Sequence, residues 1–494
     1  MIRDQIIAID QGTTSTRAVR YAADGRMLAT ASTPLRLSHP QPGWVEADAE
    51  QLWTGVQECV RQVMDDRVAA IGITNQRETV LLWDRGSGRA LHPAIIWQDR
   101  RTAAQCEALR ADGAEDLVRA RTGLRLDPYF SATKLGWLLD HVPGAAALSA
   151  QGRLAAGTVD SFLLWRLTGG RSHLTDATNA SRTSLFDILR LCWDTDLLAL
   201  FDIPAGILPS VAGNCHDFGQ TDSRVTGRPV PVTAMAGDQQ AAMIGLGSVL
   251  PGRMKATYGT GCFLLAHTGD RPLLSRHRLL TTLACLVEGE AAYALEGSIF
   301  VAGAALTWLR DGLGILDGYD GIAALVAGVP DDHGVHLVPA FVGLGAPHWR
   351  SDLRASLTGL TLDTGPATIV RAALEAAAFQ TCDLIEAMRA DGLVPQDVRI
   401  DGGMASNDWF AGYLADVTGL CVDRSRNHEA TAWGAARLAG FAADIWPDPR
   451  RVPLLSGLDR FTPSIDDAHR QRRLTGWRAA IHHLLASTPP PEGT

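Results

Sequence analysis

Short apolar runs alternate with longer amphipathic stretches along the first half of the chain, and this pattern predicts a mixed α/β unit. The runs at 5–10 and 68–76 predict buried strands, because each is short, apolar and followed by polar residues. Residues 18–32 predict a hairpin with an Asp-Gly turn. Residues 48–65 place apolar side chains on one helical face behind an aspartate, which predicts a capped amphipathic helix.

A similar order of elements starts again near residue 230. Residues 230–247 read as strand, Gly-Asp turn and helix, and residues 253–267 read as strand, glycine-hydroxyl turn and strand. The second of these resembles residues 6–19 in pattern, although not in letters. A third unit, 398–417, runs from strand through a glycine pair to a helix. The restart predicts two related α/β halves facing a cleft that can bind a nucleotide and close over a substrate.

The end of the chain predicts one further helix, at 465–487, with Ser464 as its N-cap. Four apolar side chains share one face of this helix: Leu474, Trp477, Ile481 and Leu484. We expect a packing or assembly role for it. The predicted domains are residues 1–247, residues 248–440 and a helical tail at 441–494.

Composition narrows the function classes. With 494 residues, 46% hydrophobic and 20% charged, the chain has the make-up of a soluble globular protein of two or three domains. The formal net charge of −9 argues against a nucleic-acid partner, because phosphate backbones are bound through clustered positive charge. No apolar stretch reaches the roughly 18 residues of a membrane span, so no membrane insertion is expected.

Cysteine and lysine usage adds two constraints. The eight cysteines contain no CxxC pair and fit neither a zinc site nor a disulfide scaffold, which predicts free thiols in a reducing compartment. The opening apolar run is too short for a signal peptide, and we expect a cytoplasmic protein. Lys134 and Lys255 are the only lysines, and the chain has no GxxxxGK[ST] phosphate loop.

Asp10 ends the first predicted strand and opens a turn with the properties of a phosphate loop. Gly12 lets the backbone approach an anion, and the hydroxyls of residues 13–15 add neutral donors. Arg17 adds positive charge, and Asp10 can hold Mg²⁺ directly or through water. Phosphoryl transfer requires this positioning and charge neutralisation. The alternative is a hairpin turn whose hydroxyls make only local hydrogen bonds.

Asp238 stands between a predicted buried strand and a helix. A carboxylate at this position can orient a substrate hydroxyl and take its proton as a general base, which phosphoryl transfer to an alcohol requires. The alternative is a structural N-cap.

Two further glycine turns are candidates for the nucleotide. Thr260 lies between two glycines in a second candidate phosphate loop, for which the alternative is a bulged strand. Asp401 and the glycine pair 402–403 lead into a helix, where a nucleotide can lie against the backbone and Asn407 can reach its base or ribose. Here the alternative is a tight turn.

Polar and aromatic residues elsewhere suit a small polyol. Arg77 and Glu78 pair a donor with an acceptor, and Trp97, Tyr129 and Phe263 can form walls against its C–H face. Buried polar groups of this kind reject molecules that lack a hydroxyl. The alternative is a surface ion pair and three core aromatics.

The chain resembles a known family at the level of ordered motifs. The run DQGTTSTRAV at 10–19 resembles the first phosphate loop of the FGGY carbohydrate kinases. Ten more blocks, spread over nearly the whole chain in family order, are similar to the glycerol kinases within that family. They are residues 41–48, 73–79, 95–101, 127–134, 175–183, 237–243, 257–263, 294–311, 343–349 and 401–407.

This resemblance implies the two-domain sugar kinase/Hsp70/actin fold, with ribonuclease-H-like cores and an interdomain cleft. It implies transfer of the γ-phosphate of ATP to glycerol with Mg²⁺ as cofactor, glycerol and phosphate loop lying on the N-terminal side and nucleotide on the C-terminal side. It also implies a homo-oligomer, either a dimer or a tetramer.

The resemblance assigns site residues by position. Those expected to hold glycerol are Arg77, Glu78, Tyr129, Asp238 and Gln239, with Trp97 and Phe263 as apolar walls. Those expected to contact nucleotide are Thr13, Thr14, Ser15, Arg17, Thr260, Gly303, Thr307, Gly403 and Asn407. Asp10 and Asp238 are expected near Mg²⁺, with Asp238 also the general base.

The sequence departs from the family pattern at two places. Thr307 stands where the enteric bacterial enzymes are expected to have a glutamine, so this nucleotide contact is in doubt. Residues 221–231 lack both the glycine-rich loop that binds fructose 1,6-bisphosphate and the histidine phosphorylated in some Gram-positive relatives, so neither control is expected.

Two other functions stay open at this point. One is a kinase for another small polyol or sugar, because pocket volume is not visible in a sequence. The other is a non-catalytic nucleotide-binding protein of actin-like fold, against which the retained Asp10, Thr14 and Asp238 count.

Overall fold

The first lobe is built on a five-stranded sheet in the order β14-β6-β1-β2-β3. Its strands are β1 (Gln5–Gln11), β2 (Ser15–Tyr21), β3 (Met27–Pro34), β6 (Val68–Asn75) and β14 (Val232–Gly237). The first three pair antiparallel, whereas β1, β6 and β14 run parallel. The strands and the hairpin predicted in this region are confirmed. The computed structural model describes residues 2–426, 429–452 and 457–488.

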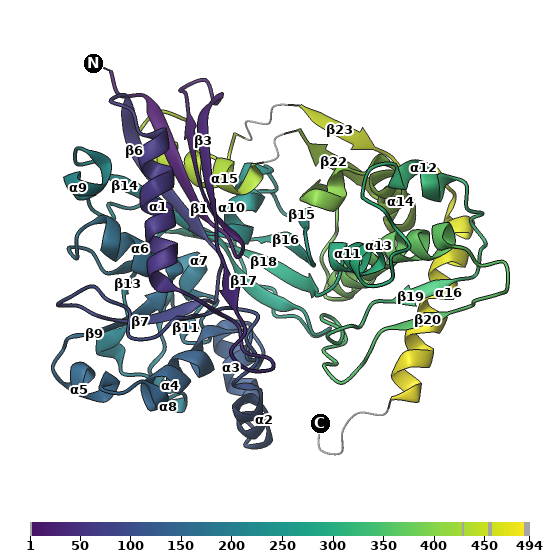
Figure 1. The fold of residues 1–494 in the computed structure, drawn as a ribbon, viewed down its shortest axis with the longest axis horizontal. Helices are drawn as coiled ribbons and strands as arrows, with labels where there is room; N and C mark the ends of the chain where they lie inside the picture. Colours follow the sequence, from purple (N-terminus) through teal and green to yellow (C-terminus); the bar gives the residue numbers. More distant parts are fainter. Residues whose placement is uncertain (1, 427–428, 453–456, 489–494) are drawn as a thin grey trace.

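The second lobe repeats this arrangement beside the first (Figure 1). Its seven-stranded sheet runs β17-β18-β16-β15-β21-β22-β23. The strands are β15 (Arg253–Tyr258), β16 (Cys262–Gly269), β17 (Leu280–Val287), β18 (Glu290–Ile299), β21 (Asp397–Asp401), β22 (Cys421–Ser425) and β23 (Leu458–Phe461). The inner five have the order and directions of β3-β2-β1-β6-β14. The predicted repeat of the α/β unit is therefore confirmed, but it begins at β15 and not near residue 230, because β14 completes the first sheet. The β1–β2 and β15–β16 turns occupy equivalent places.

Helices cover both faces of the first sheet because its strands are apolar on both sides. On one face, Ile7 and Ile9 pack against α1 (Ala49–Val63), whose N-cap is Asp48 as predicted. On the other face, Ile6 and Ala8 pack with α15 (Ala430–Ala442). Alternate side chains of a strand point to opposite faces, so β1 is buried from both directions.

The helix α15 crosses from the end of the second lobe back to the first (Figure 1). It lies against β1, β6 and β14 and crosses α10 (Asp238–Gly245), which starts directly after β14. The helices approach so closely that a Cβ on Gly434 would lie 1.8 Å from the carbonyl oxygen of Ala241. Glycine is therefore required where the two chain connections between the lobes meet.

The remaining helices and strands complete the two lobes. A second sheet of the first lobe contains β4 (Leu37–Ser38), β5 (Glu46–Ala47), β7 (Val80–Asp84), β8 (Ala94–Ile95) and β9 (Leu154–Thr158). Helices of the first lobe that bear on the site or its controls are α4 (Ser131–His141), α6 (Val159–Leu167) and α7 (Ala177–Ala180). Those of the second are α11 (Gly303–Asp311), α13 (Pro366–Ala390), α14 (Asp408–Thr418) and α16 (Asp467–Ser487).

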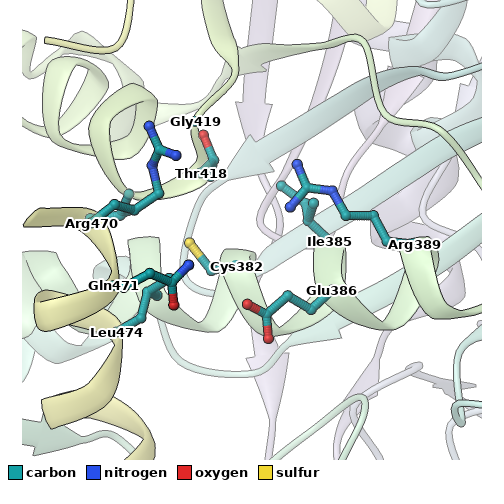
Figure 2. Close-up of a pocket in the computed structure, with 10 residues that line it drawn as sticks. Cys382, Ile385, Glu386, Arg389, Thr418, Gly419, Arg470, Gln471 and Leu474 are labelled. Atoms are coloured by element: carbon teal, nitrogen blue, oxygen red, sulfur yellow. The ribbon is translucent and has the colours of Figure 1, made fainter. Parts of the chain in front are cut away.

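The C-terminal helix α16 packs on the second lobe through the predicted apolar face, whose four side chains are all buried. Its N-cap is Asp466, which accepts from the His469 amide, so the expected cap at Ser464 is wrong. Ser464 instead donates to Asp416. A cavity of about 120 Å³ remains beside α16, with Arg470 and Arg389 on opposite sides of Cys382 (Figure 2). None of the predicted site residues lines it.

The cysteines and the apolar helices were the subject of two further expectations. All eight cysteines are unpaired, and five of them are buried. Within the part of the chain that the structure describes, no helix combines the length and apolar character needed to cross a bilayer.

Candidate functional site

Arg77 and Glu78 follow the end of β6 and are buried, each with 2% exposure, so the surface ion-pair alternative is wrong. Glu78 has a positive φ of 62°, which for a non-glycine residue stores strain and turns the chain sharply. Arg77 donates from Nη1 and Nη2 to Glu296 of β18, at 2.8 and 3.2 Å. The first lobe's arginine is thereby fixed by a carboxylate of the second lobe.

Arg182 completes this charged cluster. It donates to Glu78 Oε1 at 2.7 Å and to Glu296 Oε1 at 2.8 Å, with no exposed side-chain surface. Burial raises the pKa of Glu78 above its ordinary value, against the attraction of Arg77 and Arg182. Burial alone would also raise the pKa of Glu296, but Arg182 and Arg77 together lower it. Glu296 is therefore a stable anion that holds two arginines in place.

Asp238 is the first residue of α10, and Gly237 is the N-cap. The structural N-cap alternative for Asp238 is therefore wrong. One oxygen of Asp238 accepts from the Gln239 amide at 2.7 Å and lies 3.3 Å from Arg77 Nε. A Cβ on Gly237 would lie 2.8 Å from the methylenes of Arg77, so a glycine here lets the arginine pass the strand end. The carboxylate of Asp238 is partly exposed, so a bound molecule could reach it.

The aromatic residues predicted as walls contact one another across the two lobes. Trp97 meets Tyr129 and Phe263 edge to face, each pair with centroids 5.7 Å apart. Phe263 belongs to β16 of the second lobe, and both Trp97 and Phe263 are only partly buried. Tyr129 Oη lies 3.5 Å from Arg77 Nη2, which joins this apolar wall to the charged cluster.

The two lysines of the chain flank the same region, and neither has exposed surface. Lys134 donates to the Tyr129 carbonyl at 2.7 Å, and burial lowers its pKa to about 8. Lys255 of β15 donates to the Gln239 side chain and to Thr257 Oγ1. Each lysine thus anchors one of the residues expected to hold glycerol.

The β1–β2 turn opens next to this wall. Trp97 Nε1 donates to Thr13 Oγ1 at 2.9 Å, and the Gly12 amide donates to the Ser15 carbonyl at 2.9 Å. Thr14 is exposed. The purely local hairpin alternative does not account for the contact between Thr13 and Trp97, which joins the candidate phosphate loop to the acceptor side.

The segments expected to hold the nucleotide also come together. The Gly303 amide at the start of α11 donates to the Gly259 carbonyl at 3.0 Å, and the Ala302 amide donates to the Thr260 carbonyl at 2.9 Å. Gly402, with φ of 91°, backs onto Tyr258, and a Cβ on Gly403 would meet open space. The turn after β21 therefore lies beside the turn after β15.

Three residues expected to contact the nucleotide make hydrogen bonds or ion pairs with other residues of the protein. Asn407 caps α14 by accepting from the Phe410 amide at 3.1 Å. Thr307 is exposed and pairs with the Tyr319 hydroxyl at 2.8 Å. Arg17 forms an ion pair with Glu429, which precedes α15. In this arrangement Arg17 ties the phosphate turn to the connection between the lobes.

The donors near Asp10 suit a magnesium ion. Burial and the negative charge of Asp238 together raise the pKa of Asp10 to about 7, against the opposing effect of Arg17. Two carboxylates thus face a common region, where a divalent cation would relieve their repulsion. No three His, Cys, Asp or Glu side chains gather into a metal site in the described ranges. A site of two carboxylates completed by phosphate oxygens is the pattern that Mg²⁺ favours.

Sequence reasoning assigned no role to Glu296, Arg182 or the two lysines. Glu296 and Lys255 each stand between apolar or glycine neighbours inside a strand, and a charged residue there is rarely buried without a partner. This signal was available in the sequence. The identity of the partners was not, because it depends on how the two sheets face each other.

Comparisons with known proteins match both lobes of the chain. A model of the N-terminal domain of the FGGY family of carbohydrate kinases matches residues 5–245, and a model of the family's C-terminal domain matches residues 254–443. A glycerol kinase of Rhodospirillum centenum is 54% identical over 494 residues, covering 99% of each chain. Glycerol kinase 1 of Pseudomonas aeruginosa is 49% identical over 486 residues, covering 97% of this chain and 98% of that protein.

Solved structures show the same two-domain fold. The crystal structure of Plasmodium falciparum glycerol kinase with ADP superposes with a TM-score of 0.91 at 34% identity, covering 98% of each chain. A xylulose kinase of Lactobacillus acidophilus superposes with a TM-score of 0.88 at 21% identity, covering 98% of this chain and 99% of that one. The second likeness concerns the fold alone.

Proposed function

Because the chain belongs to the FGGY family of carbohydrate kinases, we propose that it phosphorylates glycerol with ATP, giving sn-glycerol 3-phosphate and ADP. The observation that carries this proposal is the buried Arg77–Glu78 pair beside Asp238 and a three-ring aromatic wall. A three-carbon polyol needs paired polar partners on one side and an apolar surface on the other.

The proposed mechanism assigns the proton transfer to Asp238. Arg77 and Glu78 bind the hydroxyls of glycerol, with Gln239 and Tyr129 closing the polar side. Asp238 accepts the proton of the terminal glycerol hydroxyl as the oxygen of that hydroxyl attacks the γ-phosphorus of ATP and ADP leaves. Arg77 Nε, 3.3 Å from Asp238 Oδ1, orients this carboxylate.

ATP is proposed to lie between the two glycine turns. Thr13, Thr14 and Ser15 meet the phosphates from one lobe and Thr260 meets them from the other. Gly303, Thr307, Gly403 and Asn407 contact the nucleoside side, while Arg17 adds positive charge near the phosphates. Mg²⁺ would be held near Asp10 and Asp238, where it supplies charge neutralisation on the phosphate oxygens.

We also propose domain bounds, a cellular location and an oligomeric state. We keep the domain division at residues 1–247, 248–440 and 441–494. A cytoplasmic location is supported by the eight unpaired cysteines. A homodimer or homotetramer is proposed, and its mass in solution, measured by light scattering, tests it.

The experiment that tests the function couples ADP release to NADH oxidation. Glycerol, erythritol, xylitol and xylulose are supplied separately with MgATP. We expect kcat/KM for glycerol to exceed that of each other acceptor by at least about 100-fold, because buried polar groups discriminate strongly. Turnover of a pentitol or ketopentose above that of glycerol would reject the proposed acceptor, and no turnover with any acceptor would reject a kinase.

A further inference from the structure

The segment 175–183 is polar in sequence but buried in the structure. Its Thr, Asp, Asn, Ser and Arg side chains are exposed by at most 5%. The segment resembles a family motif, yet apart from Arg182 of the charged cluster none of its residues has been given a role so far. A buried polar run of this kind is costly unless its groups are paired, so the partners of each group reveal what the segment holds.

Thr178 of α7 contacts the strand end that carries the proposed base. The backbone amide of Gly237 donates to Thr178 Oγ1 at 2.9 Å. An amide can only donate, so the hydroxyl must send its own proton elsewhere, and it donates to Asp176 Oδ2. The chain Asp176–Thr178–Gly237 therefore has a fixed direction and ends one residue before Asp238.

Asp176 is itself held from several sides. It accepts from the Thr178 amide at 2.7 Å, from Asn179 Nδ2 at 2.6 Å and from Asn214 Nδ2 at 2.9 Å. Asn214 Nδ2 also donates to the Met235 carbonyl at 2.9 Å, two residues before Gly237. The end of β14 is thus fixed at two points to one buried carboxylate.

The hydrogen bond of the Gly237 amide fixes the orientation of this peptide, because glycine has no side chain whose packing could do so. A Cβ at this position would lie 2.8 Å from the methylenes of Arg77, and the carboxylate of the next residue, Asp238, must face the substrate. A rotation of this peptide would either move the Asp238 carboxylate or press Gly237 against Arg77. The hydroxyl of Thr178 opposes that rotation.

We propose that Thr178, oriented by Asp176, is a positioning residue that sets the carboxylate of Asp238 for proton transfer. The inference rests on the proposed function and adds to it a device outside the substrate-binding residues. Its effect falls on kcat, because a small displacement of a general base slows the chemical step without removing a contact to glycerol or ATP.

The test compares Thr178→Val, Thr178→Ser and the matched control Thr168→Val. Thr168 is equally buried, follows α6, donates to the Leu164 carbonyl and accepts from the Ser172 amide at 3.2 Å. Wild-type turnover of glycerol is measured first and tests the proposed function by itself. We then expect Thr178→Val to lower kcat by about 10- to 100-fold, because the substitution leaves the buried Gly237 amide without its hydrogen-bond acceptor. KM for ATP should change by less than about twofold, because no nucleotide contact is removed.

The serine variant distinguishes a positioning role of the Thr178 hydroxyl from a role in stability alone. Thr178→Ser keeps the hydroxyl and should restore kcat to within about threefold of wild type, whereas Thr168→Val should lower the melting temperature without lowering kcat. Equal kcat in Thr178→Val and Thr168→Val would overturn the inference, as would equal losses in the valine and serine variants. If Thr178→Val does not fold, Thr178→Ala, which adds no bulk, takes its place with the same two outcomes.

Discussion

The two sides of the cleft are built in opposite ways. On the acceptor side, Arg77 and Glu78 are 2% exposed and Tyr129 and Gln239 are 8% exposed, and each is tied to a buried partner. On the nucleotide side, none of the residues assigned to ATP is buried, and Thr14, Thr260, Thr307 and Gly403 are exposed.

The difference reflects what each ligand offers. A triphosphate carries its own charge and, with Mg²⁺, can be held by backbone amides and hydroxyls on open turns. A small polyol offers only hydroxyls, so selectivity requires polar groups that would be left unpaired by a wrong ligand. Substitutions on the acceptor side should therefore cost more activity than substitutions on the nucleotide side.

The largest expected effect is that of Asp238→Asn. Without a general base, kcat for glycerol should fall by about 10²–10⁴-fold, while the dissociation constant for ADP, measured by calorimetry, should stay within a few-fold. An unchanged kcat would remove Asp238 from the mechanism. Asp217→Asn, at an exposed turn that the site does not include, is the matched control.

Glu296→Gln should rank second. The substitution leaves Arg77 and Arg182 buried without their shared anion, which typically costs about 3–5 kcal/mol of unfolding free energy. We expect kcat/KM for glycerol to fall by about 100-fold and denaturant midpoints to drop. Glu290→Gln lies in the same strand but at the surface, and it should change neither quantity. Wild-type kinetics in Glu296→Gln would refute the role of the cluster in binding.

Phe263→Ala removes the part of the wall that the second lobe contributes. We expect KM for glycerol to rise by about tenfold, since one aromatic contact and its buried area are lost. Phe461→Ala, on β23, gives the cost of losing a phenyl ring away from the cleft. If the two variants bind glycerol equally well, Phe263 is not part of the acceptor wall.

Thr307→Ala should have the smallest effect. Its side chain is exposed, and its hydroxyl contacts only the Tyr319 hydroxyl and the Gly303 carbonyl of its own helix among the described residues, so KM for ATP should change by less than about threefold. A change above about tenfold, with KM for glycerol constant, would mean that the nucleotide side depends on side chains as strongly as the acceptor side does.

The sequence predicted the elements of the fold more fully than their mutual arrangement. The strands that carry Asp10 and Asp401, the helix after Asp48 and the repeat of the α/β unit, although not its starting point, followed from local periodicity and turn residues. The return of α15 to the first sheet did not, because it depends on long-range packing through Gly434. The same limit explains the wrong cap at Ser464, where a competing carboxylate two residues later takes the amide.

The candidate site shows the same division. Residues on recognisable turns could be found by their type and order along the chain, as could the aromatic wall. The carboxylate of Glu296 and the hydroxyl of Thr178 act through partners more than 50 residues away, which no local pattern contains. Such residues become visible only when the bonds of each buried polar group are followed.

The two buried lysines give the chain an uncommon chemical property. Since Lys134 and Lys255 are the only lysine side chains and both have 0% exposure, the folded surface offers no lysine amine to acylating reagents. Acylation of either residue would require the region around Tyr129 or Gln239 to open first. The rate at which these two amines are acylated, followed by mass spectrometry, would therefore report how often the acceptor side opens. The measurement needs no engineered probe.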